Sequence, residues 1–145
     1  MTNRVEVTKI VEGARSAYFH VYLQNDGGSG ELINYTLLDP NLDFNPGQPD
    51  GMRMSLRKIW FGIAGFDIVF KFDDGGNVLD QPVWVLPAGT ASGEICLNEF
   101  GGLQDRSGID ATGKLLISTT GFNTTADQAT LVIKVNKTFK EFANP

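Results

Sequence analysis

The sequence contains very little cysteine and very little histidine. Cys96 is the one cysteine among 145 residues, so no internal disulfide can form, and a reducing compartment, or one in which thiols do not matter, is expected. Ile95 and Leu97 flank it, and this apolar setting predicts a buried, unreactive thiol. His20 is the one histidine, which leaves few ways to build a histidine-dependent active site.

Long apolar runs and clustered positive charge are missing as well. No run reaches the roughly 18 apolar residues of a transmembrane helix, and the N-terminal MTNRVEV lacks the apolar region of a signal peptide. The 12 Lys and Arg against 17 Asp and Glu give a net charge of −5, and the densest basic cluster is Arg53, Arg57 and Lys58. Binding to nucleic-acid phosphates needs more clustered positive charge than this. We therefore expect neither a membrane nor a nucleic acid as a partner.

What the sequence does contain is typical of one globular, β-rich domain. Its length of 145 residues suffices for a single core, and 41% of the residues are hydrophobic. Its 17 glycines suit a chain with many tight turns. Hydrophobic residues alternate with a period of two, most cleanly where Phe66, Ile68, Phe70 and Phe72 share one face. We find no amphipathic helix of the length that parallel βαβ units need.

These patterns predict an all-β fold. The expected architecture is a single-domain antiparallel β-sandwich of about eight or nine short strands, with a jelly-roll as the expected variant. Glycine-rich turns suggest that strands adjacent in the sequence pair as hairpins. The expected hairpins join residues 17–24 to 31–38, 66–73 to 78–86, and 114–120 to 129–136.

The β-sandwich domain is expected to span residues 1–137, followed by a C-terminal arm at 138–145. Residues 39–51 include three prolines and two glycines, which predicts a long loop that makes contacts. Loops and arms can reach a neighbouring chain. Five apolar residues in or near these segments are candidate partner-interface anchors, each equally compatible with a core position: Phe44, Met52, Met54, Phe139 and Phe142.

No residue pattern predicts an enzyme or a cofactor. His20 lies on the polar side of its strand, where pairing with a neighbouring strand is more usual than a role as a general base. No local signature supports a nucleophilic dyad of Cys96 with His20. Glu94 and Glu99, with Asp105 close by, resemble a glycosidase carboxylate pair only in composition, since the sequence does not bring them together.

A calcium loop is the nearest approach to a metal motif. Asp39, Asn41, Asp43 and Asn45 place oxygen atoms at alternate positions, as calcium-binding loops do. Phe44, however, stands where such a loop requires glycine, two prolines stiffen the segment, and no helices are expected to flank it. The segment is therefore interpreted as a turn-rich loop, and no metal is expected.

Aromatic residues offer an alternative of a different class. Trp60, Trp84, Tyr18 and Tyr22 could form a platform on which a sugar stacks. Both tryptophans lie in apolar strands, where core packing is the favoured interpretation. A carbohydrate-binding β-sandwich module remains as an alternative function, on fold-level analogy.

Five segments between residues 56 and 135 resemble small virion proteins of tailed bacteriophages. They are LRKIWFG (56–62), PVWVLP (82–87), FGGLQDRSG (100–108), TGKLLISTTGF (112–122) and LVIKV (131–135). The resemblance implies a non-enzymatic structural protein located in the virion, which assembles in the host cytoplasm. The leading hypothesis is a head decoration or cement protein, with a neck- or tail-associated protein as the alternative. Its implied partners are the major capsid protein or another virion protein, and further copies of itself, with a trimer favoured.

Overall fold

In the computed structural model the described part of the chain forms ten strands and one short helix. The structure describes residues 3–44, 52–73, 81–86, 91–97, 102–104 and 113–139. Within them no helix is long and apolar enough to cross a bilayer. The elements in chain order are β1 (Arg4–Glu12), β2 (Ser16–Gln24), β3 (Tyr35–Leu38), α1 (Pro40–Asp43), β4 (Met52–Ala64), β5 (Asp67–Phe72), β6 (Gln81–Leu86), β7 (Ala91–Cys96), β8 (Leu103–Gln104), β9 (Leu115–Thr120) and β10 (Gln128–Phe139).

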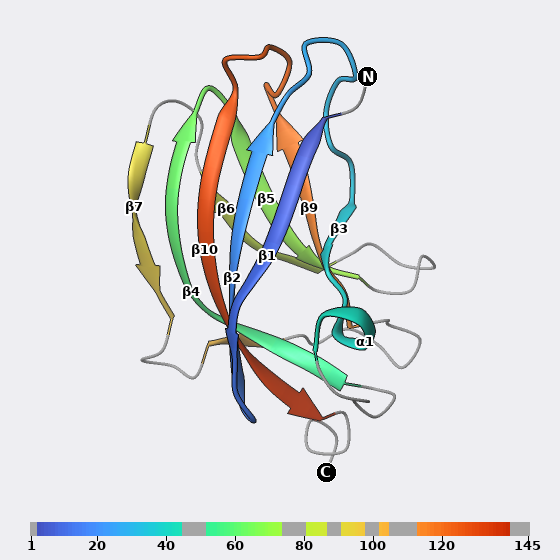
Figure 1. Ribbon diagram of the computed structural model, residues 1–145, viewed down its shortest axis with the longest axis vertical. Coiled ribbons are helices and arrows are strands. Elements are labelled where there is room, and N and C mark those ends of the chain that lie inside the picture. The colour runs from blue at the N-terminus through green and yellow to red at the C-terminus, as the bar shows by residue number, and fades with distance from the viewer. Residues whose placement is uncertain are drawn as a thin grey trace.

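The strands form two antiparallel sheets that pack face to face (Figure 1). The six-stranded sheet has the order β1-β2-β10-β4-β7, with the two-residue β8 paired to β4, and lies in front in Figure 1. The four-stranded sheet behind it has the order β3-β9-β5-β6. The chain passes repeatedly from one sheet to the other, so β2-β10-β4-β7 faces β3-β9-β5-β6 in the arrangement of a jelly-roll. The predicted all-β sandwich and its jelly-roll variant are confirmed.

Strand pairing differs from the predicted hairpins in two of three cases. β5 pairs with β6 as expected. β2 instead pairs with β1 and β10, while β3 pairs with β9 in the opposite sheet. β9 and β10, predicted to form the last hairpin, also lie in different sheets. The alternation of hydrophobic residues shows that one face of each strand is buried, but both sheets of a sandwich satisfy that requirement equally.

The core lies between the two sheets and is built from the inward faces predicted by the alternation. Phe66 and the β5 residues Ile68, Phe70 and Phe72 are fully buried. β2 contributes Phe19 and its inward neighbours from the opposite sheet, with every second residue buried. Burial of a large apolar side chain stabilises the fold by about 1.5–3 kcal/mol.

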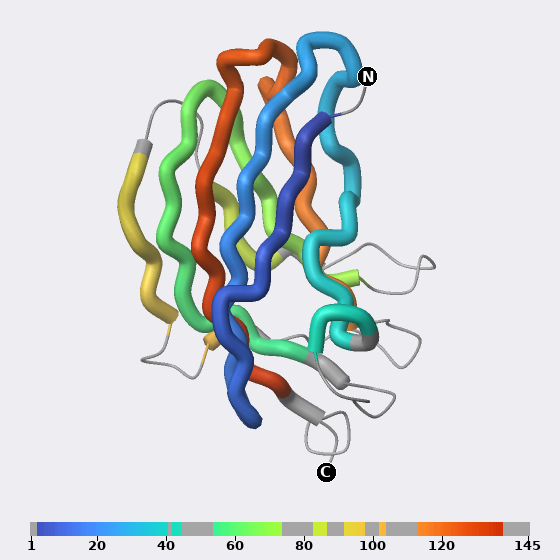
Figure 2. The backbone as a smooth tube through the Cα atoms, in the orientation of Figure 1, coloured from blue at the N-terminus to red at the C-terminus, as the bar shows by residue number. Residues whose placement is uncertain are grey.

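An irregularity in β4, where it pairs with β10, changes which residues of β4 face inward, because Arg57 is an extra residue between the pairs Lys58–Lys134 and Leu56–Val135. The register with β4 shifts between Lys134 and Val135, as in a β-bulge. Above this point Ile59 and Ile63 are buried, and below it Leu56 and Met54 are buried. Both strands bend in the lower part of Figure 2. The inward residues of β4 therefore have even numbers before the irregularity and odd numbers after it, and all four side chains reach the core.

Two loops lie at the upper end of the sandwich in Figure 2, and polar side chains join them. Asn25, which is 1% exposed, donates from Nδ2 to the carbonyl oxygens of Phe122 at 2.8 Å and Gly30 at 3.1 Å. Glu31 accepts the N–H groups of Gly121 and Phe122 at 2.7 and 2.9 Å. These bonds link the β2–β3 crossover to the β9–β10 crossover, so they fix the ends of four strands in both sheets.

Candidate functional site

The outward face of the six-stranded sheet carries a dense set of polar and aromatic side chains. The strand register places them in three rows across β2, β10, β4 and β7. The register rows are Tyr22–Thr130–Gly62–Ser92, His20–Val132–Trp60–Glu94 and Tyr18–Lys134–Lys58–Cys96. Because residues two apart on a strand share a face, these three rows form one continuous surface.

The uppermost row lies in an open groove with a volume of about 400 Å³. Its lining comes from three strands and the start of β7: Tyr22, Gly62, Ile63, Ala64, Ser92, Gln128, Ala129 and Thr130. At Gly62 a Cβ atom would meet no other atom within 4 Å, so the missing side chain leaves the floor of the groove open. Every one of these lining residues is uncharged.

Hydrogen bonds hold the Tyr22 wall of the groove in place. The Tyr22 hydroxyl donates to Oε1 of Gln128 at 3.0 Å and lies 3.4 Å from Oε1 of Gln24. Gln24 in turn donates from Nε2 to the carbonyl oxygen of Thr125 at 3.3 Å. The guanidinium carbon of Arg4 lies 5.0 Å from the centre of the Tyr22 ring. Tyr22 is thus restrained both at its hydroxyl and at its ring.

The lower rows of this face combine aromatic rings with charge. The rings of Tyr18 and Trp60 stack with centroids 6.4 Å apart and an interplanar angle of 29°. Lys58 lies over the Trp60 ring at 4.7 Å and pairs with Glu94 at 3.4 Å. Lys134 lies over Tyr18 at 5.7 Å. Lysine side chains therefore cover these rings, whereas the groove above them is free of charged residues.

A second surface lies along the side of the sandwich formed by β1, β3 and α1, on the right in Figure 1. β1 and β3 are the edge strands of the two sheets on this side. Five of the six large hydrophobic side chains exposed among the described residues lie on these elements or on the segment leading into β3: Ile10, Val11, Ile33, Tyr35 and Leu42. The sixth, Val85, lies on β6 at the opposite edge. We call the first five the β1/β3 edge surface.

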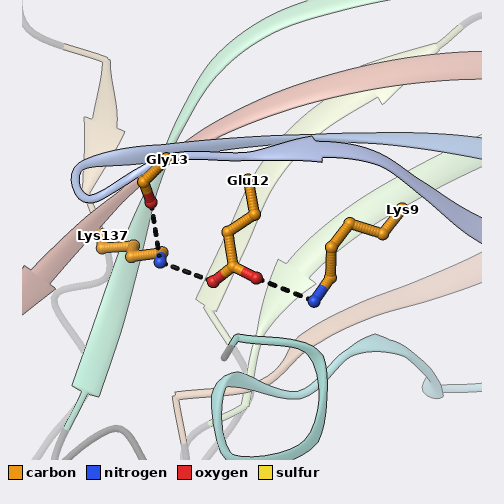
Figure 3. Close-up of polar contacts among 4 residues, drawn as sticks. All are labelled: Lys9, Glu12, Gly13 and Lys137. Atoms are coloured by element: carbon orange, nitrogen blue, oxygen red, sulfur yellow. Dashed lines mark hydrogen bonds and ion pairs between the residues drawn. The ribbon is translucent and has the colours of Figure 1, made fainter. Parts of the chain in front are cut away.

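A buried ion pair fastens β10 to the β1–β2 turn at the base of this surface (Figure 3). Lys137 Nζ lies 2.5 Å from Glu12 Oε2 and donates to the Gly13 carbonyl oxygen at 3.0 Å. The two charged side chains are only 4% and 10% exposed. The other Glu12 oxygen pairs with Lys9 at 2.8 Å, and Lys137 Nζ lies 5.2 Å from the centre of the Phe44 ring. The amine of Lys137 on β10 therefore contacts both the β1–β2 turn and the residue that follows α1.

The carboxyl groups of Asp43 and Asp127 have pKa values shifted in opposite directions. Burial raises the pKa of Asp43 in α1, although its Oδ2 accepts the N–H of Asp39 at 2.6 Å and that bond opposes the rise. The N–H groups of Asn123 and Thr124, each 2.9 Å from Oδ2 of Asp127, lower the pKa of that carboxyl. Both groups act locally on loop structure, and neither lies in the groove.

The predicted interface anchors fall into different settings. Phe44 is 3% exposed and Met54 is fully buried, so these two side chains lie in the core and offer no surface to a partner. The backbones of Met52 and Phe139 pair with each other at the ends of β4 and β10. Phe142 lies outside the described residues.

Parts of the predicted loop and of the predicted arm belong to regular elements of the structure. Within the predicted contact loop 39–51, residues 40–43 form the helical turn α1, and residues 45–51 lie outside the described residues. Within the predicted arm 138–145, Thr138 and Phe139 continue β10 by pairing with β4. The remaining arm residues, 140–145, lie outside the described residues.

The residues considered for catalysis do not converge where the structure describes them. His20 and Cys96 point to the same side of the six-stranded sheet, but three strand spacings, or roughly 14 Å, separate β2 from β7. Cys96 is exposed, not buried as predicted, because Ile95 and Leu97 take the inward positions and alternation turns the thiol outward. Glu94 pairs with Lys58, while Glu99 and Asp105 lie outside the described residues.

The metal motif and the aromatic platform are only partly described. Asp39 and Asp43 interact with each other at α1, and Asn45 lies outside the described residues. Among the described residues no group of three or more His, Cys, Asp or Glu side chains is placed to hold a metal ion. Trp60, expected in the core, lies on the outward face with Tyr18 and Tyr22, whereas Trp84 packs partly against the core from β6 in the other sheet.

The groove itself was not predicted from the sequence. Gly62, Ser92, Gln128 and Thr130 are small or polar residues without a motif, and only the register of three non-adjacent strands brings them together. A glycine within a strong strand pattern was the one available signal, since it suggests that something approaches the backbone there.

Comparison with known proteins does not assign the chain to a family. No protein-family model matches it, and no curated protein matches it either.

Proposed function

We propose that the chain is a non-enzymatic structural protein of a bacteriophage virion, namely a head decoration or cement protein that stabilises the assembled capsid. The observation that carries the proposal is that five of the six large exposed hydrophobic side chains among the described residues belong to the β1/β3 edge surface. A partner that covers such side chains removes apolar area from water, which favours association. The resemblance of residues 56–135 to phage virion proteins supports the capsid as that partner.

The proposed mechanism is thermodynamic. A protein that binds only the assembled shell stabilises that state by mass action. Many copies on one particle turn a modest contact into strong overall binding. The two sheet edges could supply backbone hydrogen bonds to a partner strand in addition to the apolar contact.

The test uses matched substitutions on the two edges of the sandwich. Changing Ile33 and Leu42 together to Ser removes the two most exposed apolar side chains, which are 78% and 82% exposed. We expect this variant to keep its melting temperature but to bind purified capsids about tenfold more weakly. Val85→Ser, at the opposite edge and 55% exposed, is the control and should bind as the parent chain does. Equal binding by all three proteins would contradict the proposed surface.

Copy number per particle separates decoration from the neck or tail alternative. A decoration protein covers a repeated lattice, so copies on the order of hundreds are expected. About a dozen copies or fewer would assign the protein to the neck or tail, because a ring there contains only a small number of subunits. Quantitative mass spectrometry of purified virions gives this number directly.

A further inference from the structure

The groove over Gly62 has the size and position of a small-ligand site. Its volume of about 400 Å³ lies within the roughly 300–1,000 Å³ typical of ligand pockets. Its floor is made by Gly62 and Thr130 on adjacent central strands, and its walls include Tyr22 and Ser92. Tyr22, Gly62 and Thr130 lie on strands that have neighbours on both sides, and Ser92 lies on the edge strand β7, so regular strands position these groups without help from a loop.

The lining selects the chemistry of the ligand. The side chains that line the groove offer hydroxyl groups from Tyr22, Ser92 and Thr130 and an amide from Gln128, and none carries a charge. A phosphate or carboxylate ligand would call for Arg or Lys, which form the strong bonds to anions. Hydroxyl and amide groups both donate and accept hydrogen bonds, as the hydroxyls of a neutral sugar do.

The backbone excludes the commonest mode of peptide binding at this place. β10 is paired with β2 and β4, and β4 is paired with β10 and β7 along the groove. Their N–H and C=O groups are therefore already used, and no strand can be added here. Recognition in the groove must come from side chains alone.

Aromatic surface lies at the groove as well. The Tyr22 ring forms one wall, and its hydroxyl is fixed by Gln128. Trp60 lies two residues from Gly62 on the same face of β4, about 7 Å along the strand. Arg4 and Lys58 lie over these two rings, so a sugar in the groove would be recognised mainly by the oriented hydroxyl and amide groups of the lining.

We propose that this groove, built from Tyr22, Gly62, Ser92, Gln128 and Thr130, binds an uncharged saccharide. The inference goes beyond the structural role proposed above and does not depend on it. The groove lies on the face of the six-stranded sheet between β2 and β7, whereas the β1/β3 edge surface lies at the side. A protein bound through that edge could thus keep the groove accessible.

The test places a side chain on the floor of the groove by substituting Gly62. Gly62 has open space at its Cβ position and lies in a strand, where a β-branched residue is favourable, so Gly62→Val should fold normally. Thr8→Val is the matched control, because it places the same side chain on an exposed position of the same sheet, on β1. The probes are neutral oligosaccharides of glucose, galactose, xylose and N-acetylglucosamine, with sialylated and uronic-acid oligosaccharides and an unstructured peptide alongside.

Binding is measured on a glycan array and then by titration of tryptophan fluorescence, to which Trp60 contributes. We expect saturable binding of at least one neutral saccharide, unchanged in Thr8→Val and weakened at least about tenfold in Gly62→Val. Tyr22→Phe, which removes the hydroxyl that holds Gln128, should weaken the same ligand several-fold. No saturation by any neutral saccharide up to about 10 mM would overturn the proposal. It would also be overturned by equal binding to Gly62→Val, or by binding of only the acidic sugars or the peptide.

Discussion

The buried pair of Lys137 and Glu12 gives a sharp prediction about stability. Glu12→Ala removes the carboxylate that lies 2.5 Å from an amine whose side chain is only 4% exposed. Removing one partner of a buried ion pair lowers the free energy of unfolding by about 3–5 kcal/mol, because a charge is left uncompensated. Water can enter through the vacated position of Glu12, so we expect the lower end, about 3 kcal/mol.

Two further variants make the prediction specific. Lys137→Met keeps the apolar stem and leaves Glu12 paired with Lys9, so we expect a loss of about 1–2 kcal/mol. Lys9→Met removes the outer partner, whose side chain is 35% exposed, and should lower stability by less than about 1 kcal/mol. Glu12→Ala leaves the most buried charge, Lys137, without a carboxylate, and of the two lysine variants Lys137→Met removes the more buried partner of Glu12.

The assay is urea unfolding followed by tryptophan fluorescence, at low and at high salt. A loss of 3 kcal/mol corresponds to a fall in melting temperature of about 6–12 °C for a chain of this size. The loss should persist in about 1 M NaCl, since salt screens buried pairs much less than exposed ones. If Glu12→Ala lost no more stability than Lys9→Met, or if salt abolished its effect, the reasoning from burial would be refuted.

Three other substitutions test the core and the loops. Asn25→Ala should lower the free energy of unfolding by about 2 kcal/mol, because it leaves the carbonyl oxygen of Phe122 without its side-chain donor and takes one of two such donors from that of Gly30; urea unfolding measures this. Asp127→Asn should destabilise the fold at pH 7. Its lowered pKa means that the carboxylate's contribution is present above the unfolded value near 3.8 and is lost as pH falls through the lower folded value, so unfolding curves of variant and parent should converge in acid. Phe70→Ala, in the centre of the core, should cost about 3–5 kcal/mol in the same urea assay, and a loss below about 1 kcal/mol would contradict its placement.

Local alternation in the sequence predicted which side chains are buried wherever a strand is regular. Phe66, Ile68, Phe70 and Phe72 all lie in the core as their spacing requires. Cys96 follows the same rule and faces outward, whereas the apolar character of its two neighbours wrongly predicts a buried thiol. Alternation is a property of a single strand, so it predicts which face of the strand is buried but not which strands it pairs with.

The sequence did not predict which strands pair with each other, or in which register, and the reason is physical. Burial of β9 and β10 against each other in one sheet, or across the two sheets, would remove similar apolar area from water. The shift between Lys134 and Val135 then decides that Met54, a candidate interface anchor, points inward. Both effects depend on contacts between strands far apart in the chain, and so does the groove over Gly62.

The central position of β10 has a consequence for how the protein folds. The strand that pairs with both β2 and β4 is the last of the described strands, so the six-stranded sheet is incomplete until residues 128–139 have left the ribosome. Until then β2 and β4 each present an unpaired edge, and unpaired edges recruit strands from other chains. We therefore expect ribosome-bound chains that stop before Gln128 to depend on chaperones, and released ones to aggregate. Folding becomes possible only after synthesis has passed through β10.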